Sequence, residues 1–483
     1  MQISFVPLNK KFLCFPLLFL LSFCLFSQGR GAIFDEQYEN LPRRAELSRR
    51  SYEGLPSSFS LRRFAPLPGD QADYGTCVAW AAAYAARTIS ESIALNRLNQ
   101  TETTQNAFSP VYIYRNIRPD DPQCLNGAQI YSALDYMRDV GTVKILDVER
   151  NISFPRVDLA YYRTVRKYPI ADYITLFSRD DRQKPAIITR IVKKSISEGK
   201  PVIIGMNTPD SFLVTTEVWR PSESPDVFYE GHALCVIGYD DNKYGGSFEV
   251  QNSWGRKWGN GGYIWIPYKT FTEFVTEGYE IIENISNFSE SVKFDGFVKM
   301  EAAYADNTVQ AVFKLSKEGF YTTTENFALG TKVNFIVGAR ENAYVYSFTV
   351  TQPQESATTL NNNNFYSPVL LFPEAGRSPL LNYNNNMVIL PGEEKTITLD
   401  TSGTTYLITL YSKYSLNITS IMRSFSSASG TINKKLAVAI GDDYTTALSF
   451  DENEANPVCA AFTLTPDNPN IVAAFVVAIQ HIE

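Results

Sequence analysis

The chain has 483 residues, 44% of them hydrophobic and 20% charged, which indicates two or three folded domains and excludes a disordered or coiled-coil protein. Lys and Arg total 44 against 51 Asp and Glu, so the net charge is −7 and nucleic acid is not an expected partner. Only two histidines occur, His232 and His481, and the six cysteines show no C-x-x-C spacing, which argues against a metal site.

The N-terminus has the pattern of an export signal. Lys10 and Lys11 precede an apolar run over residues 12–26, and small residues follow it. A charged start, a short apolar stretch and small residues are typical of a secretory signal peptide, which we predict over residues 1–31. We therefore expect a secreted, periplasmic or cell-surface protein, in a compartment where disulfides can form.

Two other interpretations of this start stay open. A membrane anchor needs about 20 apolar residues, and Pro16 interrupts this run, so we expect no transmembrane span once the signal is removed. Cys24 could carry a lipid, although the bulky Phe23 precedes it. After the predicted signal peptide, residues 32–54 would form a short N-terminal segment.

The first candidate for chemistry is Cys77. Polar and glycine residues from Gln71 lead into an alanine-rich run, which predicts a helix with Cys77 in its first turn. Unpaired N–H groups and the positive end of the helix dipole would favour a thiolate there. Taken alone, such a cysteine is more often a buried structural thiol.

Two later segments contain the other candidates. His232 opens an apolar, strand-like run, and Asn252 begins a run rich in tryptophan and glycine. By themselves they could be a hydrogen-bonded core histidine and a tight turn with aromatic packing. Asn252 follows His232 by 20 residues, which allows a strand, a turn and a return strand that bring the two side chains together.

Together these residues support one mechanism. A cysteine nucleophile needs a base and a third group that orients the base, and Cys77, His232 and Asn252 are of the required types. Gln71, six residues before Cys77, can donate its amide N–H to a developing oxyanion alongside the Cys77 backbone N–H.

These motifs resemble the papain family of cysteine peptidases. The resemblance rests on Gln71-x-x-x-Gly75-x-Cys77, on Gly231-His232-Ala233 with Gly238-Tyr239, and on Asn252-Ser253-Trp254-Gly255 with Trp258-Gly259 and Gly262-Tyr263. It implies an α+β, two-lobed catalytic domain over residues 55–287, with a helical lobe, a β-barrel-like lobe and a cleft between them. It implies hydrolysis of peptides or proteins without a metal or other cofactor.

The resemblance also suggests supporting residues. Gly127 and Ala128 stand where the family has paired glycines that bind substrate backbone, and Gly231 would join them. The loop at Gly127 could equally be an exposed turn. Trp254 would shield the histidine–asparagine pair from water.

Some positions depart from the family pattern. Tyr74 replaces a disulfide cysteine, so Cys124 lacks its usual partner, and Val78 replaces the aromatic residue after the nucleophile. About 23 residues separate the predicted signal from Leu55, too few for a long inhibitory propeptide. How activity is restrained is therefore open.

The last part of the chain reads differently. After a polar join at residues 284–289, residues 290–483 contain runs of β-branched and aromatic residues separated by Gly, Pro and Asn clusters, which predicts an all-β, sandwich-like accessory domain. Anchoring, substrate recruitment, support of the catalytic domain, and contact with a cell surface, carbohydrate or protein are all possible roles.

The sequence thus predicts a secreted cysteine peptidase. The alternative is an exported binding protein with a degenerate peptidase domain. The departures from the family pattern at Val78 and Ala128 leave room for this alternative. Cleavage specificity is not predicted, and neither is the choice between endopeptidase and exopeptidase.

Overall fold

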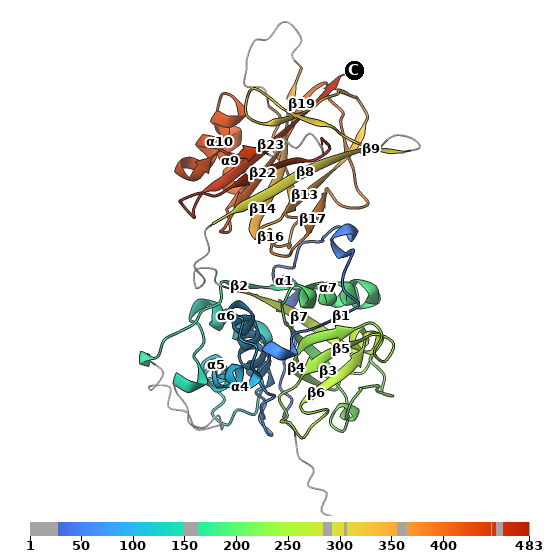
Figure 1. The fold of residues 1–483 in the computed structure, drawn as a ribbon, viewed down its shortest axis with the longest axis vertical. Helices are drawn as coiled ribbons and strands as arrows, with labels where there is room; N and C mark the ends of the chain where they lie inside the picture. Colours follow the sequence, from blue (N-terminus) through green and yellow to red (C-terminus); the bar gives the residue numbers. More distant parts are fainter. Residues whose placement is uncertain are drawn as a thin grey trace, which may run out of the picture.

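The computed structural model describes residues 28–147, 163–283, 292–303, 307–354, 365–445, 447–450 and 457–482. These residues form two bodies stacked along the long axis of the molecule (Figure 1). The first, lower in the figure, combines helices with a sheet, and the second is rich in β-strands. The predicted α+β class with a β-rich second part is confirmed. The apolar run of the signal and the polar join lie outside the described residues.

A helix that begins at Cys77, as predicted, runs through the centre of the first body. It consists of α2 (Cys77–Ala79), a π-helical stretch (Trp80–Arg87) and α3 (Thr88–Ala94). The alanines between Ala79 and Ala86 are buried, and their small side chains allow close packing against the sheet. The other helices are α1 (Gln37–Asn40), α4 (Gln100–Gln105), α5 (Pro110–Ile117), α6 (Ile130–Asp139), α7 (Pro185–Ser197) and α8 (Tyr268–Phe274). Among the described residues, no helix is both long and apolar enough to cross a membrane.

The sheet of the first body is antiparallel, in the order β2-β7-β3-β4-β5-β6, with β1 also paired to β4. Strand β4 contacts the central helix and α7 and is buried over most of its length. The strands are β1 (Ser58–Ser60), β2 (Asp172–Thr175), β3 (Val202–Thr208), β4 (Glu230–Asp240), β5 (Ser247–Gln251), β6 (Tyr263–Pro267) and β7 (Val275–Ile282). This arrangement places His232, near the start of β4, beside the first turn of the central helix.

The second body is a sandwich of two sheets that share one apolar core. One sheet contains β10 (Phe313–Leu315), β11 (Tyr321–Thr323), β12 (Phe327–Ala328), β14 (Ala343–Pro353), β15 (Val369–Phe372), β16 (Leu380–Leu381), β19 (Gly403–Ser412), β20 (Tyr444–Thr445) and β23 (Val472–Ile482). The other contains β8 (Phe294–Ala303), β9 (Thr308–Gln310), β13 (Lys332–Ala339), β17 (Asn386–Leu390), β18 (Ile397–Thr398), β21 (Ser449–Phe450) and β22 (Ala460–Leu464).

Two helices that the sequence analysis did not anticipate accompany this sandwich. Helices α9 (Ile418–Ser427) and α10 (Ile432–Ile440) cover the outer face of the sheet that contains β14, β19 and β23. Phe425 and Leu436 are buried in this second apolar layer. The domain is therefore β-rich rather than all-β.

The N-terminal segment, residues 28–54, connects the two bodies. Drawn in blue in Figure 1, it runs along the first body and then between the two. The Arg43 N–H donates to the Gly376 carbonyl at 2.9 Å, and the Ser378 N–H donates to the Arg43 carbonyl at 2.6 Å. Ala45 and Leu47 are buried in the sandwich core. The β domain therefore holds the segment by both hydrogen bonds and apolar burial.

A buried ion pair reinforces this junction. Arg44 donates to Glu280 of β7 at 2.5 Å and to Asn382 of the β domain at 2.6 Å. Tyr383 donates its hydroxyl to the second Glu280 oxygen at 2.6 Å, and the Arg44 guanidinium lies 4.0 Å from the Tyr383 ring centroid. The side chains of Arg44 and Glu280 are only 3% and 0% exposed, so each charge depends on the other.

Glu280→Ala is expected to lower the free energy of unfolding by about 3–5 kcal/mol, because it leaves the Arg44 charge buried and unpaired. Urea unfolding of the full chain measures this change. Glu273→Ala is the matched control, since Glu273 pairs with an 86% exposed Lys269 at 3.8 Å and should cost at most about 0.5 kcal/mol. Equal effects of the two substitutions would contradict this role of the junction.

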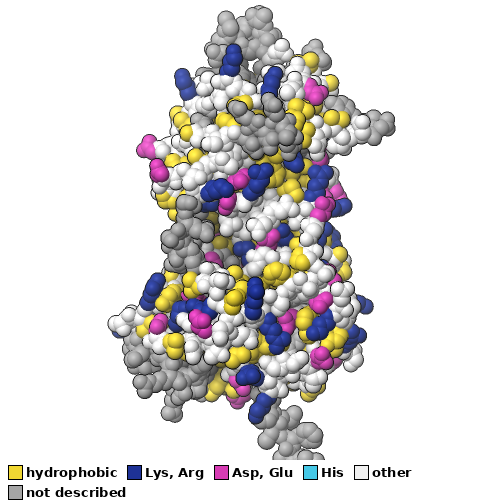
Figure 2. Space-filling view, viewed as in Figure 1, with side chains coloured by type: hydrophobic (Ala, Val, Ile, Leu, Met, Phe, Trp, Pro, Cys, Tyr) yellow, Lys and Arg dark blue, Asp and Glu magenta, His cyan; other side chains and the backbone are white. Residues whose placement is uncertain are grey.

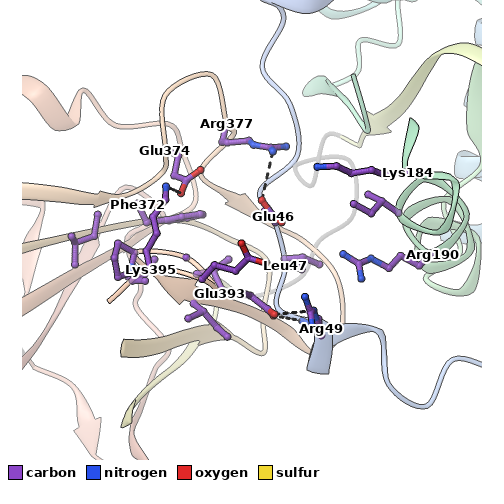
Figure 3. A pocket seen from close by; sticks show the side chains of 18 residues that line it. Glu46, Leu47, Arg49, Lys184, Arg190, Phe372, Glu374, Arg377, Glu393 and Lys395 are labelled. Atoms are coloured by element: carbon purple, nitrogen blue, oxygen red, sulfur yellow. Dashed lines mark hydrogen bonds and ion pairs between the residues drawn. The ribbon is translucent and has the colours of Figure 1, made fainter. Parts of the chain in front are cut away.

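A cavity of about 330 Å³ also lies at this junction. Figure 3 shows Leu47 and Arg49 of the N-terminal segment facing Lys184 and Arg190 of the first body, with the β domain on the other side. Arg49 is bound to Glu393 at 3.1 Å. None of the candidate catalytic residues lines this cavity, so the chemistry must lie elsewhere.

Candidate active site

The structure brings His232 and Asn252 together, as their spacing predicts. His232 Nε2 lies 2.8 Å from Asn252 Oδ1, and the same oxygen accepts the Ser253 N–H at 2.7 Å. Because Oδ1 is an acceptor, the imidazole must carry its proton on Nε2. This tautomer leaves Nδ1 able to accept the proton of a thiol.

Cys77 lies beside this histidine. The backbone N–H of Ala233, the residue after His232, donates to Cys77 Sγ at 3.4 Å. The Cys77 and His232 side chains are fully buried. The first turn of the central helix and the start of β4 thus bring the thiol and the imidazole into one enclosed site.

Gln71 is fixed by a residue that the sequence analysis did not single out. The Ser253 hydroxyl donates to Gln71 Oε1 at 2.5 Å, and the Gln71 N–H donates to the Ser253 carbonyl at 2.7 Å. With its oxygen held in this way, Gln71 presents Nε2 as a donor. The place of Ser253 directly after Asn252 was the available signal for this positioning role.

Aromatic side chains enclose the imidazole. Trp254 stacks on the His232 ring with the centroids 4.4 Å apart and an interplanar angle of 24°. Phe212 lies edge-on, 6.2 Å from the His232 ring and 5.6 Å from the Trp254 ring. No motif in the sequence pointed to Phe212. No histidine is visible on the face of the molecule in Figure 2, in keeping with the burial of both His232 and His481.

The loop before Ala128 is held by Asp121, which the sequence analysis also missed. Its carboxylate accepts the Tyr114 hydroxyl and the Asn126 N–H, both at 2.8 Å. Gly127 has a φ of +76°, a backbone conformation that favours glycine. Among the described cysteines none forms a disulfide, so Cys124 is a buried thiol.

The chain's own N-terminal segment occupies the cleft. The Ala128 N–H donates to the Gly31 carbonyl at 2.8 Å, and the Ile33 N–H donates to the Ala128 carbonyl at 3.0 Å, so the two segments pair in parallel. The Ala32 N–H donates to the Gly231 carbonyl at 3.0 Å. Two residues predicted to bind substrate backbone, Ala128 and Gly231, therefore bind residues 29–33, which we call the cleft strand.

The cleft strand also reaches the oxyanion donor. Gln71 Nε2 donates to the Gly29 carbonyl at 2.9 Å and to the Tyr74 carbonyl at 2.7 Å. The Trp254 indole N–H donates to the same Gly29 carbonyl at 3.0 Å. The Gly29 carbonyl thus occupies Gln71 Nε2, the donor that would stabilise the oxyanion of a reaction intermediate.

Glycine is required at two positions of the cleft strand. A Cβ atom on Gly31 would lie 2.3 Å from the Gly75 carbonyl oxygen, and one on Gly29 would lie 1.9 Å from the Tyr74 carbonyl oxygen. These contacts are with backbone atoms, which cannot move aside without disturbing the turn before Cys77. The cleft strand fits only because it has no side chain at these two points.

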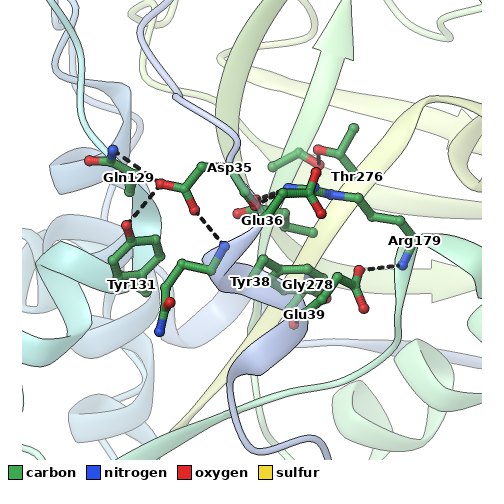
Figure 4. A network of polar contacts seen from close by, with 12 residues as sticks. Asp35, Glu36, Tyr38, Glu39, Gln129, Tyr131, Arg179, Thr276 and Gly278 are labelled. Atoms are coloured by element: carbon green, nitrogen blue, oxygen red, sulfur yellow. Dashed lines mark hydrogen bonds and ion pairs between the residues drawn. The ribbon is translucent and has the colours of Figure 1, made fainter.

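Polar contacts fasten the segment just beyond the cleft strand (Figure 4). Asp35 accepts the Tyr131 hydroxyl at 2.9 Å, and Arg179 donates to the Asp35 carbonyl at 2.7 Å. The buried Tyr38 hydroxyl accepts the Gly278 N–H at 3.1 Å. These contacts join the segment to α6, to the loop after β2 and to β7.

Burial sets the protonation state of the covered site. It raises the pKa of the Cys77 thiol to about 11, although N–H donors from Ala233 and Gly31 act in the opposite direction. It lowers the pKa of His232 to about 3, against the effect of the hydrogen bond that His232 donates to Asn252. Exclusion of water in this covered state therefore acts against the thiolate expected from the helix dipole, because burial favours a neutral thiol and a neutral imidazole.

Comparisons with known proteins agree with this geometry. Residues 56–276 match the model of the papain family cysteine proteases, and the first body is a papain-like cysteine peptidase domain, as predicted. An uncharacterised peptidase C1-like protein of Acanthamoeba polyphaga mimivirus is 28% identical over 250 residues, which cover 47% of this chain and 75% of that protein. A cysteine protease of Blomia tropicalis is 26% identical over 231 residues, 45% of this chain and 62% of that protein.

Solved structures of similar proteins include xylellain, a cysteine protease from Xylella fastidiosa. It is 21% identical, with a TM-score of 0.43, and the match covers 53% of this chain and 97% of xylellain. Procathepsin L 3 from the larval midgut of Tenebrio molitor is 16% identical, with a TM-score of 0.38, and the match covers 53% of this chain and 76% of that protein.

Proposed function

We propose that this protein is a secreted cysteine peptidase that is held inactive by its own cleft strand. The observation that carries the proposal is the Gly29 carbonyl on Gln71 Nε2, in a site where His232 is bound to Asn252. The groups arranged for peptide hydrolysis are thus complete, and a segment of the same chain uses them. Displacement of the cleft strand would free them for a substrate.

The free site supports the following reaction. The Cys77 thiol transfers its proton to His232 Nδ1, and the thiolate attacks the substrate carbonyl to form a tetrahedral intermediate. Gln71 Nε2 and the Cys77 backbone N–H donate to the oxyanion. The imidazolium gives its proton to the leaving amine as the C–N bond breaks. Water, deprotonated by His232, then hydrolyses the thioester and regenerates the thiol.

The cleft strand blocks this reaction in two ways. It occupies the oxyanion donor, and it forms the hydrogen bonds of Ala128 and Gly231 that a substrate backbone would need. The segment is too short for a long inhibitory propeptide, and the sequence left the restraint of activity open; these contacts of residues 29–33 support a restraint by the short segment itself.

The charged and apolar start of the chain supports export, by which the protein would reach a secreted, periplasmic or cell-surface location. A signal that ended at residue 31 would remove Gly29 and Gly31 with it. We therefore place the end of the proposed signal at Ser27, which leaves the cleft strand in the exported protein.

The β domain would serve as the anchor of the N-terminal segment. The contacts of Arg43 with Gly376 and Ser378, and of Arg44 with Asn382, support this role. Contact with a cell surface, a carbohydrate or another protein stays a prediction from the sequence.

The test is hydrolysis of an unfolded protein under reducing conditions by a Gly31→Val chain, in which the cleft strand cannot dock. Adding Cys77→Ala should abolish turnover and covalent labelling by an epoxide-type thiol probe, whereas Cys459→Ala should change neither. Unchanged turnover in the Cys77→Ala chain would contradict the proposal. An absence of turnover in every chain would favour the alternative of a binding protein.

A further inference from the structure

A basic side chain of the cleft strand lies in an acidic recess beside the catalytic histidine. Arg30 Nε lies 2.5 Å from Glu230, Nη2 lies 3.2 Å from Asp210, and Nη1 donates to the Thr208 carbonyl at 2.8 Å. The Arg30 side chain is only 11% exposed. A guanidinium has five N–H donors, and three acceptors surround the guanidinium of Arg30.

The recess is formed by the ends of β3 and β4, and β4 also contains His232. Glu230 and Thr208 face each other at the paired ends of β4 and β3, and His232 follows Glu230 by two residues. Asp210 lies in the same short turn as Phe212, whose ring is 6.2 Å from that of His232. The recess therefore lies beside His232, the residue that gives its proton to the leaving amine in the proposed reaction.

Arg30 also has an informative place in the chain. It directly follows Gly29, whose carbonyl accepts from the oxyanion donor Gln71. The guanidinium thus belongs to the residue between Gly29, whose carbonyl takes the oxyanion donor, and Gly31, whose N–H reaches the Cys77 thiol. A substrate residue beside the scissile bond would be within reach of the same acceptors.

Displacement of the cleft strand would leave this recess negatively charged. Within the described ranges, the ion pairs of Asp210 and Glu230 are those with Arg30. The two carboxylates and the Thr208 carbonyl would then lack a cation. Since both side chains remain largely accessible, at 87% and 62%, a substrate cation could approach them without rearrangement of the fold.

We infer that Asp210, Glu230 and the Thr208 carbonyl form a specificity site for an arginine or lysine side chain in the residue immediately after the scissile bond. This inference rests on the proposed function and names the substrate class. The favoured substrates are peptides or proteins with a basic residue on the leaving-amine side. The cleft strand holds the same site with Arg30 before activation.

Peptides that differ only in the residue after the cleaved bond test this site on the Gly31→Val chain. With Arg, Lys, Ala or Glu at that position, kcat/KM should be about tenfold higher for Arg than for Ala, and lowest for Glu. Asp210→Asn combined with Glu230→Gln should reduce the Arg-to-Ala ratio to about twofold or less. Glu273→Gln, at a half-buried carboxylate of α8, should leave the ratio as it was.

The outcomes separate the inference from the proposed function. Hydrolysis with no preference for a basic residue, with a preference only before the bond, or with a preference that survives the double substitution would overturn the inference and leave the peptidase intact. Failure to hydrolyse any peptide would overturn the proposed function, and the specificity site with it. Loss of the preference at 0.5 M salt, where exposed charges are screened, would support an ionic origin.

Discussion

Replacement of His232 by alanine is expected to lower kcat/KM for peptide hydrolysis by about 10,000-fold or more. His232 both accepts the thiol proton and protonates the leaving amine in the proposed reaction, so its loss removes both steps. The chain has only one other histidine, His481, and it cannot substitute. His481 lies in β23 of the β domain, bound to Thr405 at 2.9 Å.

His481→Ala is the matched control, because it removes a second buried imidazole far from the cleft. It should leave kcat/KM within about twofold once folding is verified by thermal unfolding. Both substitutions are best measured on the Gly31→Val chain, where the site is open. A His232→Ala chain with more than a tenth of the parent activity would contradict the role of His232 as the base.

Gly31→Val is expected to raise the initial hydrolysis rate of the full chain by about tenfold or more, before any part of the chain is cut away. A tethered segment competes with substrate at an effective concentration in the millimolar range, so its removal from the cleft has a large effect. The valine Cβ would lie 2.3 Å from the Gly75 carbonyl oxygen, which prevents docking of the cleft strand. Mass spectrometry at each time point verifies that the chain is intact.

Gly54→Val provides the comparison within the same segment. A Cβ on Gly54 meets no atom within 4 Å, although its φ of +74° makes the change locally unfavourable. This chain should keep the low initial rate of the wild type. If Gly31→Val and wild type begin at the same rate, the cleft strand does not inhibit.

Most of the candidate site could be predicted from the sequence, but the cleft strand that covers it could not. Cys77, His232 and Asn252 could be predicted together because each motif has a chemical requirement of its own, and Gln71 followed from its distance to Cys77. The cleft strand has no such signature, since residues 29–32 look like the end of an export signal. Its docking depends on the absence of side chains opposite the turn at Gly75, which only the folded structure reveals.

The second body was predictable as a class but not in detail. Runs of β-branched and aromatic residues indicated strands such as β13, β14 and β19, and these are present. The two helices have cap residues, Asn417 and Thr431, whose side chains accept N–H groups of the first turn. Among so many β-branched residues these short signals were not decisive. Arg44 and Glu280 gave no signal, because their pairing joins segments 236 residues apart.

The central claim is that an intact nucleophile lies beneath the chain's own cleft strand. It is tested most directly by the rate at which an epoxide-type thiol probe labels Cys77, located by peptide mass spectrometry, in wild type and in Gly31→Val. Slow labelling of the wild-type Cys77 and labelling about tenfold faster or more in Gly31→Val is the predicted result. Equal rates in the two chains would contradict the claim.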